Sequence, residues 1–442
     1  MFFNSLSFVV FLAAIILLVM RLPRGDMRKW GLLLASWYFY SLWCWWFSGL
    51  LILTALIHYS CARINKKWSV TLAIMLSVTI LAGFKYLGIW YTSIFMPVGI
   101  SFYTFQAISY TVDVYKQRIP MNRSFVDVAL YIGFFPQLLS GPIVRAEEFL
   151  PQLDEYRKFT FARFADGFGQ FSFGFFKKVF IADRMASFVG EVFKNCEVFD
   201  GKTLWLAAIA YTIQIYCDFS GYSDMAIGVA RVLGFDYKKN FSHPYVATNI
   251  TDFWRRWHIS LSSWLRDYIY IPLGGNRCGK IRSYLNLMAT MLLGGVWHGA
   301  DWTFVVWGAL HGLALSVHKV WMALVKPPSH PLAVNIIKIF AWTLTMLTVM
   351  FGWILFRADT FGQAWSYMGR MLCLSDGVSW LHHHVFIAGL LLFISSLKFK
   401  GKYISDYRDI RNPIGLFLAL SLFIISILYP AGNSSPFIYF QF

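Results

Sequence analysis

The chain has 442 residues, of which 58% are hydrophobic and only 14% are charged. An average soluble domain carries roughly 25% charged residues, so this composition excludes an ordinary soluble protein. The net charge of +17 is scattered among apolar stretches and gathers in no soluble basic domain, which argues against nucleic-acid binding. The positive charge instead suits loops that anchor membrane segments at anionic headgroups.

Uncharged stretches recur along the whole chain, at 1–20, 30–62, 86–112, 283–300, 339–356, 377–397 and 412–442. Together with shorter apolar runs between them, they predict about ten to twelve membrane-crossing segments. Inside a bilayer only helices and closed barrels satisfy the backbone, and these runs lack the alternation of a barrel. We therefore expect an all-α integral membrane protein with one domain over 1–442. Within it, 412–442 forms the last helix and an aromatic C-terminal tail.

The N-terminal segment from Leu6 to Met20 lacks a preceding basic region, so we interpret it as a retained first helix and not as a cleaved signal peptide. A basic cluster of Arg21, Arg24, Arg28 and Lys29 follows it directly. Basic loops favour the cytoplasmic side, which predicts that the N-terminus lies outside.

The segment 231–282 contains nine Lys or Arg and three Asp, and is too polar to consist only of lipid-facing helices. We expect re-entrant or interfacial elements that line a water-accessible cavity. Within it, 252–267 has the spacing of one amphipathic helix, with His258 at the border between its two faces. Its apolar face holds Trp254, Trp257, Leu261, Trp264 and Leu265, and its polar face holds Arg255, Ser262, Ser263 and Arg266.

Two interpretations of Arg255 and Arg256 remain open on this helix. Guanidinium groups bind the phosphates of a nucleotide-bearing donor, and they equally bind lipid headgroups in an amphipathic anchor.

His298 follows a 15-residue uncharged run from Ser283 and is flanked by Gly294, Gly295 and Gly299. These glycines allow close helix approach or bring a ligand near the backbone. A histidine in such a segment either makes a structural hydrogen bond between helices or works as a proton acceptor, since its unperturbed pKa lies near 6.5. His311, further along, is expected to line the cavity behind His298.

Several longer strings carry a family resemblance. They run in order along most of the chain: Pro97 to Gln106 (PVGISFYTFQ), Phe135 to Arg145 (FPQLLSGPIVR), Tyr216 to Asp224 (YCDFSGYSD), Phe253 to Ser262 (FWRRWHISLS), Arg266 to Gly275 (RDYIYIPLGG) and Trp297 to Ala300 (WHGA). The sequence thereby resembles the membrane-bound O-acyltransferase (MBOAT) family, and within it the alginate O-acetyltransferase branch. The charged loop from Arg145 to Arg163 resembles that branch more than the relatives that pass D-alanine to teichoic acid.

The resemblance implies a multi-pass enzyme of the bacterial cytoplasmic (inner) membrane, with helices around a central tunnel. Such an enzyme takes an acyl group, usually acetyl, from a cytoplasmic thioester and delivers it toward an extracytoplasmic polysaccharide, with a periplasmic transferase as partner. The catalytic histidine of the Trp-His-Gly motif maps onto His298, and the second histidine maps onto His258. No bound cofactor is implied, and acetyl-CoA or an acyl carrier thioester is the donor substrate.

In the mechanism we predict, His298 is the general base on an acceptor hydroxyl that attacks the thioester, and His258 orients acceptor or donor. The chain has no Gly-x-Ser-x-Gly elbow, so a serine-hydrolase route has no support. We expect Trp254, Trp257, Trp297, Arg255, Arg256, Asp218 and His311 to contact substrate or donor. The alternative for Asp218 is a structural role, in which its carboxylate pairs with an arginine or a helix terminus.

The C-terminal tail ends in Ser435 to Phe442 (SPFIYFQF) and resembles terminal motifs proposed to relay acyl groups. Tyr439 is the candidate phenolic carrier, and the alternative is an aromatic anchor at the membrane interface. We predict no metal site, since the adjacent residues His382, His383 and His384 point in different directions on a helix. Two rival functions remain: a transporter or flippase, and a non-catalytic membrane subunit of a polysaccharide-modification complex.

Overall fold

A computed structural model describes residues 3, 5–22, 25–90, 96–139, 141–155, 159–325, 330–399, 402–403, 413–430 and 437–438. These residues are almost entirely helical, which confirms the predicted all-α fold. The strands among them are the two-residue pair β1 (Lys398–Phe399) and β2 (Lys402–Tyr403), which form a small antiparallel hairpin.

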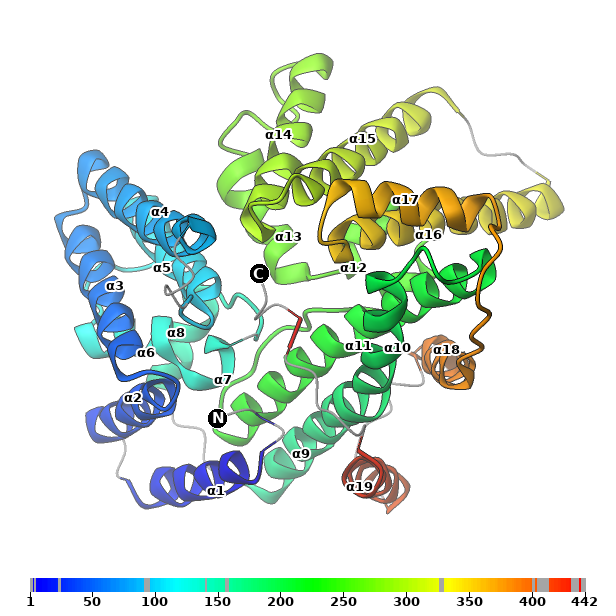
Figure 1. The fold of residues 1–442 in the computed structure, drawn as a ribbon. Helices are drawn as coiled ribbons and strands as arrows, with labels where there is room; N and C mark the ends of the chain where they lie inside the picture. Colours follow the sequence, from blue (N-terminus) through cyan, green and yellow to red (C-terminus); the bar gives the residue numbers. More distant parts are fainter. Residues whose placement is uncertain are drawn as a thin grey trace.

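The N-terminal part contains eight of the described helices, which lie on one side of the long helix α11 in Figure 1. They are α1 (Leu6–Arg21), α2 (Asp26–Ser41), α3 (Trp45–Ile64), α4 (Lys67–Trp90), α5 (Ile100–Tyr115), α6 (Phe125–Gly133), α7 (Phe135–Leu138) and α8 (Ala146–Asp154). The uncharged stretch 30–62, too long for one span of roughly 20 residues, is divided between α2 and α3.

The central part is built around α11 (Gly201–Val232), which packs along α9 (Phe161–Phe175), the π-helical turn η1 (Phe176–Ala182) and α10 (Asp183–Lys194). The backbones of α9 and α11 touch at two pairs of glycines, Gly167 with Gly228 and Gly174 with Gly221. A Cβ on Gly174 would lie 2.5 Å from the carbonyl oxygen of Gly221, and one on Gly221 would lie 2.8 Å from that of Gly174. This contact brings η1 and its two lysines, Lys177 and Lys178, against the middle of α11.

The C-terminal part lies on the other side of α11 in Figure 1. It contains η2 (Pro244–Val246), α12 (Ile250–Arg256), α13 (Ile259–Leu265), the π-helical turn η3 (Arg266–Tyr270), α14 (Lys280–His298), α15 (Trp302–Leu324), α16 (Pro331–Arg357) and α17 (Phe361–Leu372). Two apolar helices, α18 (His383–Ser396) and α19 (Pro413–Leu428), cover the outer side of α9, η1 and α10.

Three described helices are long and apolar enough to cross a membrane by length and composition: α3, residues Lys67–Tyr86 of α4, and α16. Shorter apolar helices cover Ser7–Arg21, His383–Ser396 and Gly415–Leu428. The larger number of crossings expected from the sequence stays a prediction, as does the single-domain organisation.

The helix expected over 252–267 is wrong as a continuous element. It breaks into α12 and α13, and His258 between them has a left-handed backbone with φ 42° and ψ 56°. The predicted faces nevertheless hold, because Trp257, Leu261 and Trp264 are buried while Arg255 and Arg266 are exposed. The apolar face packs against the protein interior, and His258 is buried there instead of lying at a border.

Candidate active site

His298 ends α14, and glycines in that helix bring its ring against the neighbouring helices. A Cβ on Gly295 would lie 2.3 Å from the carbonyl oxygen of Phe304 in α15, and one on Gly308 would lie 2.5 Å from that of Met291 in α14. The two helices therefore touch backbone to backbone, as the glycines flanking His298 predict. The His298 side chain is 3% exposed.

Aromatic rings from three helices surround His298. The ring centroid of His298 lies 4.6 Å from that of Trp297, 5.0 Å from that of Trp307 in α15 and 5.0 Å from that of Phe356 in α16. Apolar walls of this kind exclude water, which matters because an activated water would hydrolyse a thioester.

His258 is held by Asn240 at the break between α12 and α13. Asn240 Oδ1 accepts the backbone N–H of Ser260 at 3.2 Å and its hydroxyl at 2.9 Å, and it lies 3.2 Å from His258 Nδ1. Because these donors identify the oxygen as an acceptor, Nδ1 of His258 donates to it. The neutral ring then has its lone pair on Nε2, the nitrogen that faces away from Asn240.

His311 lies in α15 and is fully buried. Trp254 Nε1 donates to its Nδ1 at 3.4 Å, and the ring of Trp307 lies 4.8 Å from it. Trp307 therefore contacts both His298 and His311. His311 therefore lies close to His298, and its predicted role in lining a cavity behind His298 stays a prediction.

The three predicted histidines form one buried cluster. His298 interacts electrostatically with His258, His311 and Lys85. Phe102 of α5 connects two parts of the cluster, with its ring 6.3 Å from that of His258 and 6.4 Å from that of Trp297. Helices α5, α14 and α15 and the break after α12 thus converge at one place.

Trp297 and Trp257 serve as walls of the cluster. The ring of Trp297 stacks on Phe105 at 5.2 Å, and Phe105 stacks in turn on Trp264 at 4.1 Å. Trp257, 1% exposed, packs against Trp353 of α16 at 4.8 Å.

The two arginines predicted to bind donor are placed differently. Arg256 is engaged within the protein, donating to the Asp252 carboxylate at 2.8 Å, the Ser242 carbonyl at 3.2 Å and the Tyr403 hydroxyl at 3.1 Å. Arg255 is exposed and interacts with His318. Arg256 therefore ties α12 to the β1–β2 hairpin, and Arg255 is the more accessible of the two.

Asp218 lies in α11, inside a buried ion cluster. Its carboxylate is 2.6 Å from the Lys178 ammonium, which is also 2.7 Å from the Asp183 carboxylate. The other oxygen of Asp218 accepts the backbone N–H of Ile438 at 2.9 Å. The predicted structural pairing occurs, but with a lysine in place of an arginine.

The C-terminal tail is described only at Phe437 and Ile438, and Tyr439 lies outside the described residues. Phe437 is fully buried, with its ring 4.5 Å from that of Tyr222 and 5.5 Å from that of Phe219. Phe219 in turn lies 4.6 Å from the ring of His258. This part of the tail therefore packs in the protein interior, one ring away from the histidine cluster.

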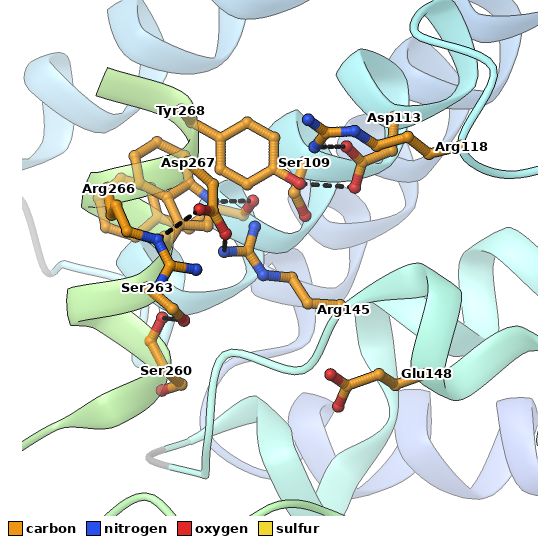
Figure 2. Close-up of polar contacts among 12 residues, drawn as sticks. Ser109, Asp113, Arg118, Arg145, Glu148, Ser260, Ser263, Arg266, Asp267 and Tyr268 are labelled. Atoms are coloured by element: carbon orange, nitrogen blue, oxygen red, sulfur yellow. Dashed lines mark hydrogen bonds and ion pairs between the residues drawn. The ribbon is translucent and has the colours of Figure 1, made fainter. Parts of the chain in front are cut away.

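A network of polar contacts lies around Arg145, Asp267 and Tyr268 (Figure 2). Arg145, before α8, pairs with Asp267 at 3.2 Å and lies over the ring of Tyr268, 4.5 Å from its centroid. The Tyr268 hydroxyl donates to Asp113 of α5 at 2.5 Å. Nearby, the backbone N–H of Ile143 donates to Ser260, the residue that Asn240 binds. This network ties α5, the loop before α8 and η3 together.

A cavity of about 390 Å³ adjoins the same asparagine. Its polar wall includes Lys177, Asp224 and Asn240, and its apolar wall includes Leu391 of α18 and Leu418 of α19. Within the described part of the chain, no cluster of three or more His, Cys, Asp or Glu has the arrangement of a metal site.

Sequence reasoning missed Asn240, Lys85 and Lys178. Asn240 and Lys178 carry no motif that identifies them, and their roles depend on tertiary contacts. Lys85 had one signal, because a single lysine inside an apolar segment is costly unless it has a function or a partner.

Comparison with known proteins identifies the family of this chain. The sequence profile described as MBOAT, membrane-bound O-acyltransferase family, matches residues 116–356, a range that includes all three histidines of the cluster. The chain belongs to this family. It is similar to a probable alginate O-acetylase of Azotobacter vinelandii, at 39% identity over 85% of this chain and 79% of the relative.

Two further relatives widen the comparison. A peptidoglycan O-acetyltransferase of Helicobacter pylori is 34% identical over 94% of this chain and 91% of the relative. A teichoic acid D-alanyltransferase of Bacillus subtilis is 28% identical over 60% of this chain and 69% of the relative. This acyltransferase is an O-acetyltransferase and a membrane protein, which sets aside the transporter and non-catalytic alternatives.

Proposed function

We propose that this enzyme transfers acetyl groups from a cytoplasmic thioester toward hydroxyls of an extracytoplasmic polysaccharide, with His298 as the general base. The observation that carries the proposal is the buried cluster of His298, His258 and His311 between aromatic walls. The named relatives act on alginate and on peptidoglycan, and these are the two acceptors to test first.

In the proposed reaction, the acceptor hydroxyl gives its proton to His298 while its oxygen attacks the thioester carbonyl. The resulting tetrahedral intermediate collapses as the carbon–sulfur bond breaks, and the proton moves from His298 to the leaving thiolate. The products are an O-acetyl ester and a free thiol. The Nδ1–H of His258 donates to Asn240, so Nε2 of His258 can accept a hydrogen bond from a second hydroxyl or N–H group of the acceptor or donor and thereby orient it.

The donor is proposed to be acetyl-CoA or an acyl carrier thioester, with no resident cofactor. We place the donor side at the basic ends of the N-terminal helices. Basic residues gather at the α1–α2 and α3–α4 connections and at the end of α5, whereas the α2–α3 connection at 42–44 has none. The basic residues are Arg21, Arg28, Lys29, Arg63, Lys66, Lys67, Lys116 and Arg118. This bias supports a cytoplasmic location for those ends, an outside N-terminus and residence in the bacterial inner membrane.

We test the proposal with purified enzyme in lipid nanodiscs, given radiolabelled acetyl-CoA and soluble oligosaccharides of alginate or peptidoglycan, and count the label that reaches either the protein or the oligosaccharide. His298→Ala is expected to lower the transfer rate by about 10²–10⁴-fold, the usual contribution of a general base. The matched control is His384→Ala, which changes an exposed histidine far along the chain. Wild-type transfer by folded His298→Ala protein would contradict the proposal.

A periplasmic transferase is the proposed partner that receives the acetyl group, and Tyr439 is the proposed phenolic carrier. Support comes from the neighbouring residues, because Phe437 and Ile438 are buried and Asp218 binds the backbone of Ile438. Mass spectrometry after incubation with acetyl donor is expected to find an acetyl adduct on Tyr439 and none on the exposed Tyr429. An unmodified Tyr439 in the absence of acceptor would leave the tail as an aromatic anchor.

A further inference from the structure

Lys85 is a charged residue in the apolar helix α4, near the end of a segment capable of crossing a membrane. Its ammonium donates to the backbone carbonyl of Trp297 and lies 5.4 Å from the centroid of the Trp297 ring. A charge in such a segment is expensive, so it is retained where specific partners or a function compensate its cost.

Lys85 caps the helix that carries His298. The last carbonyls of a helix have no partners inside that helix. At the end of α14, Lys85 binds the carbonyl of Trp297, and the hydroxyl of the adjacent Tyr86 donates to that of Val296 at 2.8 Å. A cation at this end also interacts favourably with the helix dipole. Two consecutive residues of α4 therefore hold the final turn of α14, where His298 lies.

Lys85 also acts on His298 through its charge. The titratable groups that interact with His298 in the described part of the chain are Lys85 from α4, His258 from the α12–α13 break and His311 from α15. Helix α16 contributes the uncharged ring of Phe356. In a buried site of low dielectric, a nearby ammonium opposes a second positive charge on an imidazole.

We propose that Lys85 is a positioning residue for acetyl transfer, which fixes the Trp297–His298 turn and places its charge beside the buried His298 ring. This inference rests on the proposed role of His298 as general base, since only a neutral imidazole accepts a proton. It adds a residue that lies outside the family-matched range 116–356.

The test separates the charge of Lys85 from its hydrogen bond. Lys85→Gln keeps an N–H donor for the Trp297 carbonyl and removes the charge, whereas Lys85→Arg keeps both. Tyr86→Phe is the matched control, because it removes the neighbouring carbonyl bond without changing any charge. Each variant is assayed for kcat and KM in nanodiscs across pH, after size-exclusion chromatography has shown that it is folded.

Lys85→Gln is expected to lower kcat about tenfold or more with a smaller change in KM, a loss on the scale of a removed electrostatic contact in an active site. The pH dependence of kcat should change as well, because the variant removes an ionisable group next to His298, while burial still disfavours a protonated His298 ring. Lys85→Arg should keep most of the activity, and Tyr86→Phe should lower kcat less than Lys85→Gln does.

Folded Lys85→Gln with the wild-type kcat and pH profile would overturn the inference. An equal loss of kcat in Tyr86→Phe would overturn it as well, because Lys85 would then be only a helix cap. Should Lys85→Gln not fold, Lys85→Arg decides, since a tenfold loss there contradicts a role based on charge. Wild-type activity of His298→Ala would instead remove the proposed function itself. If His298→Ala is inactive while Lys85→Gln behaves like the wild type, only the inference on Lys85 is wrong.

Discussion

Replacing Lys178 with methionine is expected to destabilise the protein more than any single change of its two acidic partners. Lys178 and its partners Asp183 and Asp218 have side chains that are at most 2% exposed. Lys178→Met leaves two carboxylates facing each other in the interior without the lysine between them. Breaking a buried pair by removing one partner costs about 3–5 kcal/mol.

Asp218→Asn makes a smaller change to the same cluster. The ion pair of Lys178 with Asp183 remains, and the new amide oxygen still accepts the N–H of Ile438. The expected cost is about 1–3 kcal/mol, the range for a weakened buried hydrogen bond. A triple variant with Lys178→Met, Asp183→Asn and Asp218→Asn carries no charge and should recover part of the stability lost in Lys178→Met alone.

The measurement is thermal unfolding in a mild detergent, followed by tryptophan fluorescence and by recovery of monodisperse protein. The expected order of Tm is wild type, Asp218→Asn, then Lys178→Met, with the triple variant above Lys178→Met. A Lys178→Met protein as stable as Asp218→Asn would refute the reasoning, because removing the lysine that joins the two carboxylates would then cost no more than neutralising one of them.

Two further changes test packing and a helix cap. Gly295→Ala should destabilise the protein, because its Cβ would lie 2.3 Å from the Phe304 carbonyl, while Gly190→Ala, with open space around it, should be neutral or gain up to about 1 kcal/mol in thermal unfolding. Burial opposes ionisation of Asp200, but hydrogen bonds from Ser379 and the first turn of α11 outweigh it and hold the pKa of Asp200 below its usual value. The stability that its charge contributes is therefore present at neutral pH and lost in acid, so the Tm difference between wild type and Asp200→Asn should shrink toward about pH 3; a constant difference would contradict this.

The helical class and its approximate segments follow from composition, because lipid leaves the backbone few alternatives. Uncharged runs mark where helices lie, as at α3 and α16. The same reasoning fails at His258, because α12 and α13 keep one apolar face across their break. Periodicity reports which side chains are buried, and it carries no signal for one residue with a positive φ.

The ion cluster shows a second limit of pattern reading. A charged residue at Asp218 in an apolar run indicates a partner, but the sequence does not say which one. The partner is Lys178, which lies in the π-helical turn η1. An α-helical wheel drawn on the sequence does not give the direction of a side chain in such a turn. Neither the π-turn nor the glycine contact that presses it onto α11 is visible as periodicity.

The histidine cluster depends on contacts between helices that are distant in the sequence. His258, His298 and His311 stand out individually, each by its unusual setting in an apolar chain. Their proximity follows from the backbone contact of α14 with α15, and the electrostatic setting of His298 follows from α4, more than two hundred residues earlier. Motifs therefore identify the candidate reactive residues, whereas the neighbours that affect their charge and orientation become visible only when the helices are packed. For this enzyme, Asn240 and Lys85 are such neighbours, and they are the positions at which function can change while every family motif stays intact.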